Sequence, residues 1–357
     1  MGKNRFDCII VGLGLAGSAL AVQFLLRKKK ILVFDQPSEN NSSTIAAGLF
    51  NPISGKRMIK TWLADELFPY LKKFYQQVEN LTHSHFFYSS PIYRPFLSVV
   101  EQNEWMAGSS ENSLSGFVKK VFTSSQHGEF IYDDLGGILL EQSGYLDTKT
   151  YISSVRSWLI KEGSYRDEFL DFNELNITAS DVNYKDSCAS RIICCDGVKS
   201  ASGKLFSWLP LLSLKGETLC IKAKFLKDVI VNRGVYLVPN GMDQWRVGST
   251  YQRDFNHGGI TDEGREELVK NLESLVKIDY EIIGHDAGIR PVTPDRRPIL
   301  GKHPEHPTVL IFNGMGTKGV SLAPYFSEML IHSIDNSIRI NKEVDINRYK
   351  SLYWNSR

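Results

Sequence analysis

A turn of three spaced glycines near the start of the chain constrains its fold more than any other feature. The three are Gly12, Gly14 and Gly17. A near-continuous apolar run over residues 6–11 precedes the turn, and such a run is typical of a strand buried on both faces in a parallel sheet. A helical pattern of apolar residues follows, and a second apolar strand, residues 31–34, ends at Asp35. The sequence therefore predicts a Rossmann-type unit in the order strand, turn, helix, strand.

Each glycine has a physical role in binding the pyrophosphate of a nucleotide. Gly12 makes the tight turn, Gly14 leaves space for phosphates to approach the backbone, and Gly17 lets the helix pack closely on the strand. The helix N-terminus supplies unpaired N–H groups to the phosphates. Asp35 follows Gly17 by 18 residues, close to the ~20 expected for the acid that binds a ribose hydroxyl, and this favours NAD or FAD over NADP. The alternative is a glycine-rich turn in an α/β domain that binds no nucleotide.

A second strand, glycine turn and helix occur near the other end of the chain. An apolar strand at residues 309–312 runs into a turn rich in glycine, and a helix is expected from about residue 321 to 333. A simple NAD-dependent dehydrogenase has little need of this second turn. A flavin enzyme can use both turns, with the ADP half of FAD on the first helix and the isoalloxazine ring at the last turn, where the helix dipole favours negative charge. The two turns together indicate FAD.

A stiff, arginine-rich segment at residues 288–301 precedes the second turn. It contains three prolines and three arginines. Proline fixes its own φ and extends the residue before it, so Arg290 is expected to be mounted on a rigid backbone. A planar guanidinium can bind a carboxylate through two parallel hydrogen bonds, which predicts a carboxylate-binding site. The alternative is a salt bridge that joins two domains. Arg296 and Arg297 are expected to be structural or solvated.

The middle of the chain is expected to contain two helices and many strands. The helices cover about residues 62–81 and 148–161, where apolar residues have helical spacing. Short strands are expected between residues 86 and 140. The β pattern returns between residues 215 and 283, with a hairpin that turns at Asn240-Gly241.

The composition limits the size, partners and compartment of the protein. The 357 residues, 42% of them hydrophobic, exceed one ordinary core and suggest two domains. The net charge of +2 and the pI of about 8.1 do not favour a nucleic acid as partner. The five cysteines, an odd number without zinc-ligand spacing, are expected to be reduced. No signal peptide or membrane-spanning segment is evident, which predicts a cytoplasmic protein.

The ordered motifs of the whole chain resemble the D-amino-acid oxidase family of FAD-dependent oxidoreductases, and most of all its glycine oxidase and sarcosine oxidase-like members. The motifs that carry this resemblance are residues 11–17, 46–49, 144–147, 215–217, 235–239 with 247–250, 288–291 through 298–301, and 314–324. The resemblance implies an α/β (α+β overall) fold, with a Rossmann-type FAD-binding domain and a substrate domain built on an antiparallel β-sheet. The implied domains are discontinuous, with FAD bound by residues 1–65, 141–212 and 285–357 and substrate bound by residues 66–140 and 213–284.

The resemblance also implies roles for individual residues. Arg290 would bind the substrate carboxylate, and Tyr236 would donate a hydrogen bond to the same group. Lys318, at the start of the last helix, would stabilise negative charge on the reduced flavin, or would alternatively point to solvent. The substrate α-carbon would then lose a hydride to flavin N5, giving an imine that water hydrolyses. The residues expected to contact FAD are Gly12, Gly14, Leu15, Ala16, Gly17, Asp35, Gln36, Ser43, Thr44, Ala46, Ala47, Gly48, Leu49, Asp196, Gly197, Gly288, Gly314, Gly316, Thr317, Lys318, Gly319 and Val320.

The chain departs from the family pattern at three places. Sarcosine oxidase-like members carry their flavin covalently on Cys or His, and no matching residue occurs near residues 46–57 or in the last glycine turn, which predicts non-covalent FAD. Cys195-Asp196-Gly197 stands where relatives have a small residue followed by Thr-Gly. Asn51-Pro52 through Lys56-Arg57 differs from well-known oxidases, and this difference suggests a subgroup with another substrate.

The expected substrate is a small carboxylated amine of glycine, sarcosine or D-amino acid type, and the electron acceptor is O2 or a carrier. One alternative is an FAD oxidoreductase that acts on the carboxymethylaminomethyl group of wobble uridine in tRNA, since the reacting end of that group is a glycine. A dehydrogenase that uses a quinone or a carrier protein is a second alternative. A non-catalytic flavoprotein is the third. The sequence leaves the oligomeric state open.

Overall fold

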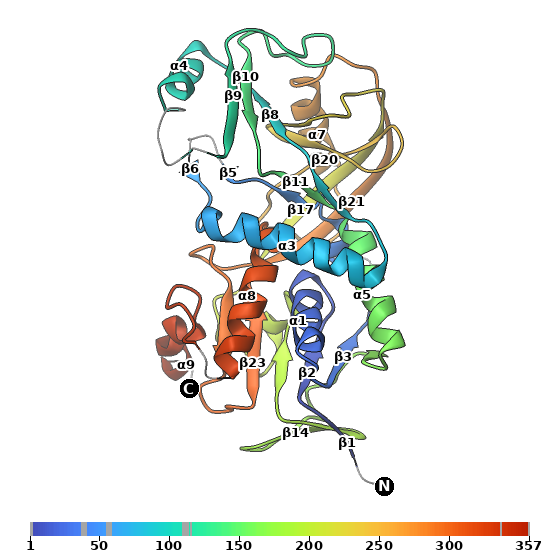
Figure 1. Ribbon diagram of the computed structural model, residues 1–357, viewed down its shortest axis with the longest axis vertical. Helices are drawn as coiled ribbons and strands as arrows, with labels where there is room; N and C mark the ends of the chain where they lie inside the picture. Colours follow the sequence, from blue (N-terminus) through green and yellow to red (C-terminus); the bar gives the residue numbers. More distant parts are fainter. Residues whose placement is uncertain are drawn as a thin grey trace.

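The computed structural model of the chain has two lobes stacked along its long axis (Figure 1). The structure describes residues 3–36, 41–54, 59–108, 114, 116–335 and 338–355. The sequence difference noted above at Lys56 and Arg57 lies outside these ranges. Strand β1 (Asn4–Phe6) and helix α9 (Lys350–Asn355), near the two ends of the chain, both belong to the lower lobe of Figure 1.

The lower lobe is built on a six-stranded sheet, and this sheet confirms the predicted Rossmann-type unit. Its strand order is β12 (Tyr165–Asp167), β3 (Ile31–Asp35), β2 (Cys8–Val11), β16 (Ile192–Cys194), β23 (Val309–Asn313) and β22 (Ile299–Lys302). The first five strands are mutually parallel, and β22 is antiparallel to β23. All four residues of β2 are buried, as its apolar run predicts for a sheet covered on both faces.

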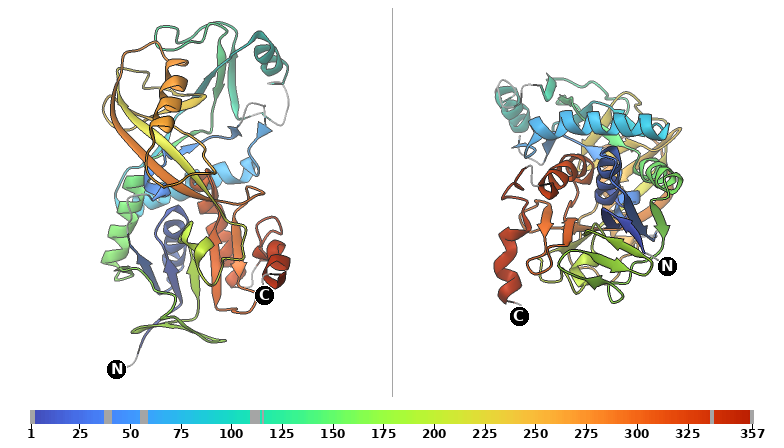
Figure 2. Two further views of the ribbon diagram at one scale, coloured as in Figure 1. Left: turned by 180° about the vertical axis from the view of Figure 1, so that it is seen from behind. Right: turned by 60° about the horizontal axis from the view of Figure 1, so that its bottom comes forward.

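The two faces of this sheet are covered by different elements. Helices α1 (Leu15–Leu26), α8 (Gly319–Ile334) and α5 (Thr148–Lys161) cover one face (Figures 1 and 2). Ile9 of β2 points to the opposite face, where it packs with Val182 of a small four-stranded sheet. Alternate side chains of one short strand therefore enter two separate cores.

The upper lobe is built on an eight-stranded, largely antiparallel sheet, which confirms the predicted antiparallel β-sheet. Its order is β21 (Glu281–Val292), β17 (Leu212–Lys222), β20 (Gln244–Gly248), β19 (Val235–Pro239), β18 (Ile230–Arg233), β8 (Ile92–Pro95), β10 (Gly137–Leu140) and β9 (Val118–Phe122). Neighbouring strands are antiparallel except for β18 and β8, which are parallel. The predicted hairpin at Asn240-Gly241 joins β19 to β20.

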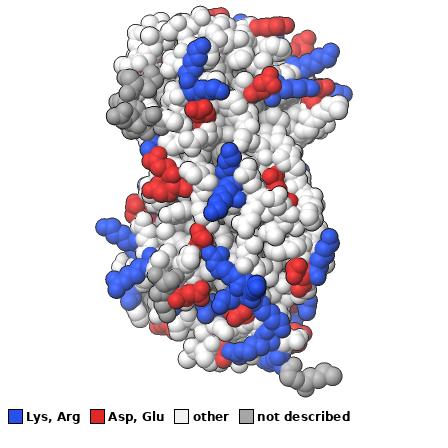
Figure 3. Space-filling model, in the orientation of Figure 1, with Lys and Arg blue, Asp and Glu red and all other residues white. Residues whose placement is uncertain are grey.

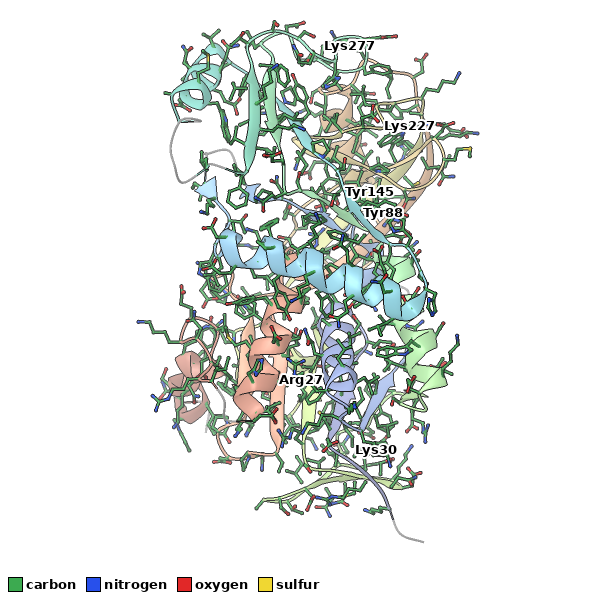
Figure 4. All side chains as sticks on the ribbon, in the orientation of Figure 1. Arg27, Lys30, Tyr88, Tyr145, Lys227 and Lys277 are labelled. Carbon is green, nitrogen blue, oxygen red and sulfur yellow. The ribbon has the colours of Figure 1, made fainter. Side chains whose placement is uncertain are left out.

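The junction of the lobes is formed by a long helix and a short sheet. Helix α3 (Ala64–Thr82) lies across the junction in Figure 1. The short sheet contains β4 (Leu49–Phe50), β11 (Gly144–Leu146) and β7 (Phe87–Ser89). Tyr88 and Tyr145, labelled in Figure 4, stack across β7 and β11 with their ring centroids 4.7 Å apart. The stack links β7, which follows α3, to β11, which leads into α5.

Three sequence expectations need correction. Helices α4 (Val99–Gly108) and α7 (Asp262–Glu273) lie in regions predicted to contain only strands. The strand expected over residues 6–11 begins at Cys8, because β1 belongs to a different sheet. The short helix α2 (Ser42–Ile45) follows β3. The remaining short elements are β5 (Ile53–Ser54), β6 (Ile59–Lys60), β13 (Asn176–Ile177), β14 (Val182–Tyr184), β15 (Ser187–Ala189), α6 (Lys199–Ser202) and the 3-10 helix η2 (Ile346–Tyr349).

The surface carries both signs of charge. On the face in Figure 3, Lys and Arg side chains are interspersed with Asp and Glu side chains, as the near-neutral net charge suggests. Within the described ranges, none of the helices combines the length and the apolar character needed to cross a membrane.

Candidate active site

A cavity of about 1360 Å³ lies where the two sheets meet. Its lower wall includes residues at the carboxyl ends of β2, β3, β16 and β23, which is where open α/β sheets bind ligands. Its upper wall includes Tyr236 and Arg290 from the eight-stranded sheet. A pocket for one drug-sized ligand usually measures ~300–1,000 Å³, so this cavity has room for a dinucleotide and a second ligand.

The first glycine turn needs glycine at two positions for space alone. Gly12 has φ +93°, and a Cβ there would lie 2.8 Å from the carbonyl oxygen of Cys195. A Cβ on Gly17 would lie 1.9 Å from the carbonyl oxygen of Gly12. Gly14, Leu15 and Ala16, at the start of α1, line the cavity, and a helix N-terminus leaves N–H groups without intrahelical acceptors. The turn therefore presents a backbone surface suited to phosphate.

Asp35 ends β3 and lines the cavity. Its Oδ1 accepts a hydrogen bond of 2.9 Å from the backbone N–H of Leu13, and its Oδ2 lies 3.3 Å from Nη2 of Arg156. These contacts orient the carboxylate beside the glycine turn. Each carboxylate oxygen has a second lone pair that can accept a hydrogen bond from a ribose hydroxyl.

Residues 41–48, which follow β3 and are mostly small, pack against the glycine turn. Asn41 caps α2 by accepting a hydrogen bond from the N–H of Ser43, and Ser43 Oγ accepts one of 3.2 Å from the N–H of Leu15. Gly48 has φ +69°, and a Cβ there would lie 1.8 Å from the carbonyl oxygen of Leu146. The segment is thus fixed to both the first helix and β11.

Asp196 and Gly197 follow β16 and line the cavity at the position where the chain departs from its relatives. Ser200 donates a short hydrogen bond to Oδ1 of Asp196. Burial raises the pKa of Asp196, although the bond from Ser200 and the charge of Lys199 oppose this. Asn313 donates to the carbonyl oxygen of Gly197 over 2.8 Å, so the ends of β16 and β23 are joined here.

The second glycine turn places Lys318 at the start of α8. Gly316 has φ +57° and lines the cavity together with Thr317 and Lys318. Burial lowers the pKa of Lys318, and the nearby Arg297 and Arg296 lower it further. Its Nζ lies 3.4 Å from Oγ1 of Thr61, so the ammonium group is turned inward rather than to solvent.

Arg290 lies on β21 and projects across the neighbouring strand β17. A Cβ on Gly216 would lie 2.2 Å from both Nη1 and Nη2 of Arg290, so the guanidinium rests directly on the backbone of Gly216. The ring of Tyr251 covers it at 5.4 Å from Cζ, a cation–π contact. Nη1 is buried and has no hydrogen-bond partner among the described residues. The plane of the guanidinium is fixed, and its edge is available to an acceptor in the cavity.

Tyr236 lies on β19, directly opposite Gly248 of β20. A Cβ on Gly248 would lie 2.5 Å from the Tyr236 hydroxyl oxygen, so this glycine makes room for the phenol. Burial raises the pKa of Tyr236 to about 12, and the charges of Arg290 and Arg246 only partly offset this rise. The phenol therefore stays protonated at neutral pH and can donate a hydrogen bond beside Arg290.

Three residues of this site were not predicted individually. Gly216 and Gly248 belong to motifs noted in the sequence, but their function as space for Arg290 and Tyr236 depends on strand register. Tyr251 follows β20 and is 63% exposed, and it carried no signal beyond its place after the strand. Arg297 stacks on Trp62 at 4.0 Å, in line with its expected structural role.

The cavity brings together most of the residues expected at the site. Those that line it are Gly12, Gly14, Leu15, Ala16, Asp35, Gln36, Ser43, Ala46, Ala47, Gly48, Leu49, Asp196, Gly197, Tyr236, Arg290, Gly316, Thr317, Lys318, Gly319 and Val320. Four expected residues lie behind the wall instead, namely Gly17, Thr44, Gly288 and Gly314. Gly288 is one of these because a Cβ there would meet the backbone of Ser42 at 3.1 Å, which makes it a packing position.

Comparisons with known proteins define the class of this chain. The family model described as FAD dependent oxidoreductase (DAO) matches residues 7–332, and the chain belongs to this family. The description of this family names FAD as its cofactor. The residues that line the cavity fit this cofactor. The glycine turn and the start of α1 would lie against its pyrophosphate, and Asp35 at the end of β3 would accept a hydrogen bond from a ribose hydroxyl.

Three relatives show how far the similarity to individual proteins extends. Glycine oxidase from Pseudomonas aeruginosa is 29% identical over 126 residues, 34% of this chain and 35% of the relative. Glycine oxidase from Bacillus licheniformis is 32% identical over 147 residues, 37% and 38% respectively. The matched stretches thus span little more than a third of these relatives. The bifunctional tRNA 5-methylaminomethyl-2-thiouridine biosynthesis protein MnmC from Shewanella amazonensis is 23% identical over 400 aligned positions, 94% of this chain and 57% of the relative.

A solved structure supports the same fold. Glycine oxidase from Geobacillus kaustophilus superimposes with a TM-score of 0.79 and 18% identity, covering 94% of this chain and 96% of that one. At this identity the likeness concerns the fold alone.

Proposed function

We propose that the protein oxidises the C–N bond of a small carboxylated amine of glycine, sarcosine or D-amino acid type. The observation that carries the proposal is Nη1 of Arg290, which is buried without a hydrogen-bond partner in the described part of the chain and borders the cavity beside Tyr236. A buried N–H group left unpaired costs ~1–3 kcal/mol, so an acceptor from a ligand is expected there. The glycine oxidases among the relatives support an amino acid as that ligand.

We propose that FAD binds without a covalent link along the lower wall. The first turn of α1 and Asp35 would hold its ADP half, while the segment 46–49 and the turn 316–320 would hold its flavin half. When bound, FAD supplies the hydride acceptor for the oxidation. Lys318 would place a positive charge at the start of α8, where the helix dipole acts in the same sense.

The residues of this chain act mainly by positioning. Arg290 would donate hydrogen bonds to the carboxylate along the edge of its guanidinium, and Tyr236 would donate a further one to the same group. The plane fixed by Gly216 and Tyr251 sets the direction in which the amine and the α-carbon extend. Holding a reactant in this way can lower the activation free energy by ~7–11 kcal/mol. No separate acid–base pair at the α-carbon is required by this scheme.

Anaerobic bleaching of the flavin by candidate amines tests the proposal. Arg290→Ala is expected to raise KM for glycine or sarcosine by ~100-fold or more, since each hydrogen bond to a charged group contributes ~1.5–3 kcal/mol. FAD content should be unchanged. Arg265→Ala, which removes an exposed arginine on α7, is the matched control. Loss of FAD from Arg290→Ala with unchanged kinetics per flavin would contradict the assignment.

The electron acceptor follows from a second measurement on the same protein. Mixing the reduced enzyme with air-saturated buffer in a stopped-flow instrument gives the rate of flavin reoxidation. Reoxidation as fast as turnover supports an oxidase. Reoxidation much slower than turnover with an artificial quinone supports a dehydrogenase that uses a carrier.

A second candidate function is oxidation of a glycine-like group on tRNA. The alignment with the MnmC protein along 94% of this chain favours it, because the two glycine oxidases named above align over only 34% and 37% of the chain. The interspersed surface charges do not favour it. Flavin reduction by tRNA that carries the carboxymethylaminomethyl group, compared with reduction by free glycine, distinguishes the two. Bleaching by the tRNA alone would replace the first proposal with the second.

A further inference from the structure

The cavity extends well beyond Arg290 and Tyr236 along the upper sheet. Asn232 pairs with Tyr236 across β18 and β19. Ile230 and Val231 pair with Ile92 and Tyr93 in the parallel ladder of β18 and β8, and the next step in this register places Asn232 beside Arg94. Paired residues point to the same face of a sheet. Tyr236, Asn232 and Arg94 therefore form one row, and all three line the cavity.

The far end of this row is cationic. Arg94 and Arg233 both line the cavity, and the side chain of each is 14% exposed. Glu101 binds Arg233 through two hydrogen bonds of 2.7 and 2.8 Å, and the same carboxylate lies 3.8 Å from Arg94. Two guanidinium groups thus share this one carboxylate. Asp134 also borders the cavity, but it is exposed to solvent.

The charge at Arg94 is held in an unfavourable environment. Burial lowers the pKa of Arg94, and the neighbouring charge of Arg233 lowers it further, against the opposing effect of Glu101. An arginine remains charged in spite of such shifts. A guanidinium also has five N–H donors, so Arg94 can bind an anion in the cavity while it keeps its protein contacts.

The distance along the row defines the ligand. Strands in a sheet are ~4.8 Å apart, and β8 is two strands from β19. Arg94 is therefore about 10 Å from Tyr236 along the sheet, by the same spacing. Glycine or sarcosine, bound by its carboxylate at Arg290, would leave Asn232 and Arg94 without a ligand.

We propose that the substrate is a carboxylated amine with a second anionic group, a carboxylate or a phosphate, which Arg94 and Asn232 bind about two strand spacings from the first. This inference rests on the proposed oxidation of a carboxylated amine at Arg290. It adds a specificity-determining role for Arg94 and Asn232, which lie away from the carboxylate bound at Arg290.

Turnover of a matched substrate series tests the inference. N-alkylglycines with four to six methylenes would end in a carboxylate, a phosphate, a hydroxyl or a methyl group. The anionic ends are expected to give kcat/KM ~10–100-fold above the hydroxyl end, as for a hydrogen bond to a charged group, and comparison of carboxylate with phosphate identifies the group. Arg94→Gln should abolish this preference and leave kcat/KM for sarcosine within twofold. Equal losses for all substrates, or no preference for an anionic end, would overturn the inference.

A binding measurement separates this inference from the proposed oxidation. Unreactive dicarboxylates from succinate to suberate are titrated into the FAD-loaded protein while the flavin absorbance is followed. Affinity should rise by ~10-fold or more with length in the wild type, but not in Arg94→Gln or, if that variant does not fold, in Asn232→Leu. Arg265→Gln on the exposed face of α7 is the control. Length-independent affinity in the wild type refutes the second site even if no amine is oxidised, whereas a length-dependent affinity without amine oxidation refutes only the proposed reaction.

Discussion

Gly216→Ala is the substitution whose effect can be worked out most fully from the structure. The new Cβ would lie 2.2 Å from Nη1 and Nη2 and 2.4 Å from Cζ of Arg290. Ordinary contact requires ~3.5 Å, so the guanidinium must move by more than ~1 Å. The three atoms nearest to the new Cβ all belong to the end of one flexible side chain. The chain can therefore fold, but the carboxylate-binding group is displaced.

The expected cost is in substrate binding and rate. A misplacement of ~1 Å can reduce the rate by ~100-fold, which corresponds to ~2.7 kcal/mol in the barrier. We expect kcat/KM for the carboxylated amine to fall by this order, with most of the change in KM. The free energy of unfolding should change by less than ~1 kcal/mol, because no core group is lost.

The assay compares steady-state kinetics, the ratio of flavin to protein absorbance and urea unfolding for wild type and variant. Gly284→Ala is the matched control, since it lies on the same strand β21 and its Cβ would meet only Cβ of Cys220 at 3.3 Å. The control should retain wild-type kinetics. Unchanged kcat/KM in Gly216→Ala would refute the argument that the guanidinium must rest on this backbone. An equal fall of kcat/KM in both variants would mean that distortion of β17 and β21, and not displacement of Arg290, causes the loss.

Four further predictions follow from the same geometry. Tyr236→Phe should raise KM ~10-fold through loss of one hydrogen bond to a charged group, with FAD content unchanged; an unaltered KM would contradict the role. Because burial raises the pKa of Tyr236 from 10 to about 12, the Kd of an unreactive monocarboxylate should stay constant to about pH 11, whereas weakening centred near pH 10 would show an unshifted phenol. Gly17→Ala would clash with backbone at Gly12, so purified protein should lack its yellow colour and lose ~1–3 kcal/mol or more in urea unfolding; normal flavin content would refute this. Lys215→Met would remove the ammonium group 2.9 Å from the fully buried Glu217 and leave it, among the described residues, only His285 and the donors of Thr261. A loss of ~3–5 kcal/mol is expected in the same assay, and an unchanged midpoint would contradict it.

The sequence was sufficient for the elements whose signal is local. The strand, turn and helix from Cys8 to Leu26 could be predicted because an apolar run and three glycines occur in adjacent positions. Helix α7 was missed because only Leu268 and Leu272 supply its apolar face. A signal was present, since Thr261 caps the helix and acidic residues occupy its first turn.

The upper part of the site could not be predicted because its contacts depend on strand register. Gly216 lies under Arg290 only because β17 and β21 pair along their full length. Arg94 and Asn232 are 138 residues apart, and they become neighbours through a single parallel pairing inside an antiparallel sheet. No local pattern encodes such a pairing, because crossovers between distant strands are fixed by packing of the whole lobe.

The order of strands in the lower sheet has a consequence for biosynthesis. β16 pairs with β2 on one side and with β23 on the other, so its second hydrogen-bonding edge stays open until the segment 309–313 has been made. Most of the polypeptide therefore leaves the ribosome before the nucleotide-binding lobe can close, and such long-range pairing is slow and prone to aggregation. We therefore expect that folding of this chain depends on chaperones and that added flavin during expression increases the yield of folded protein.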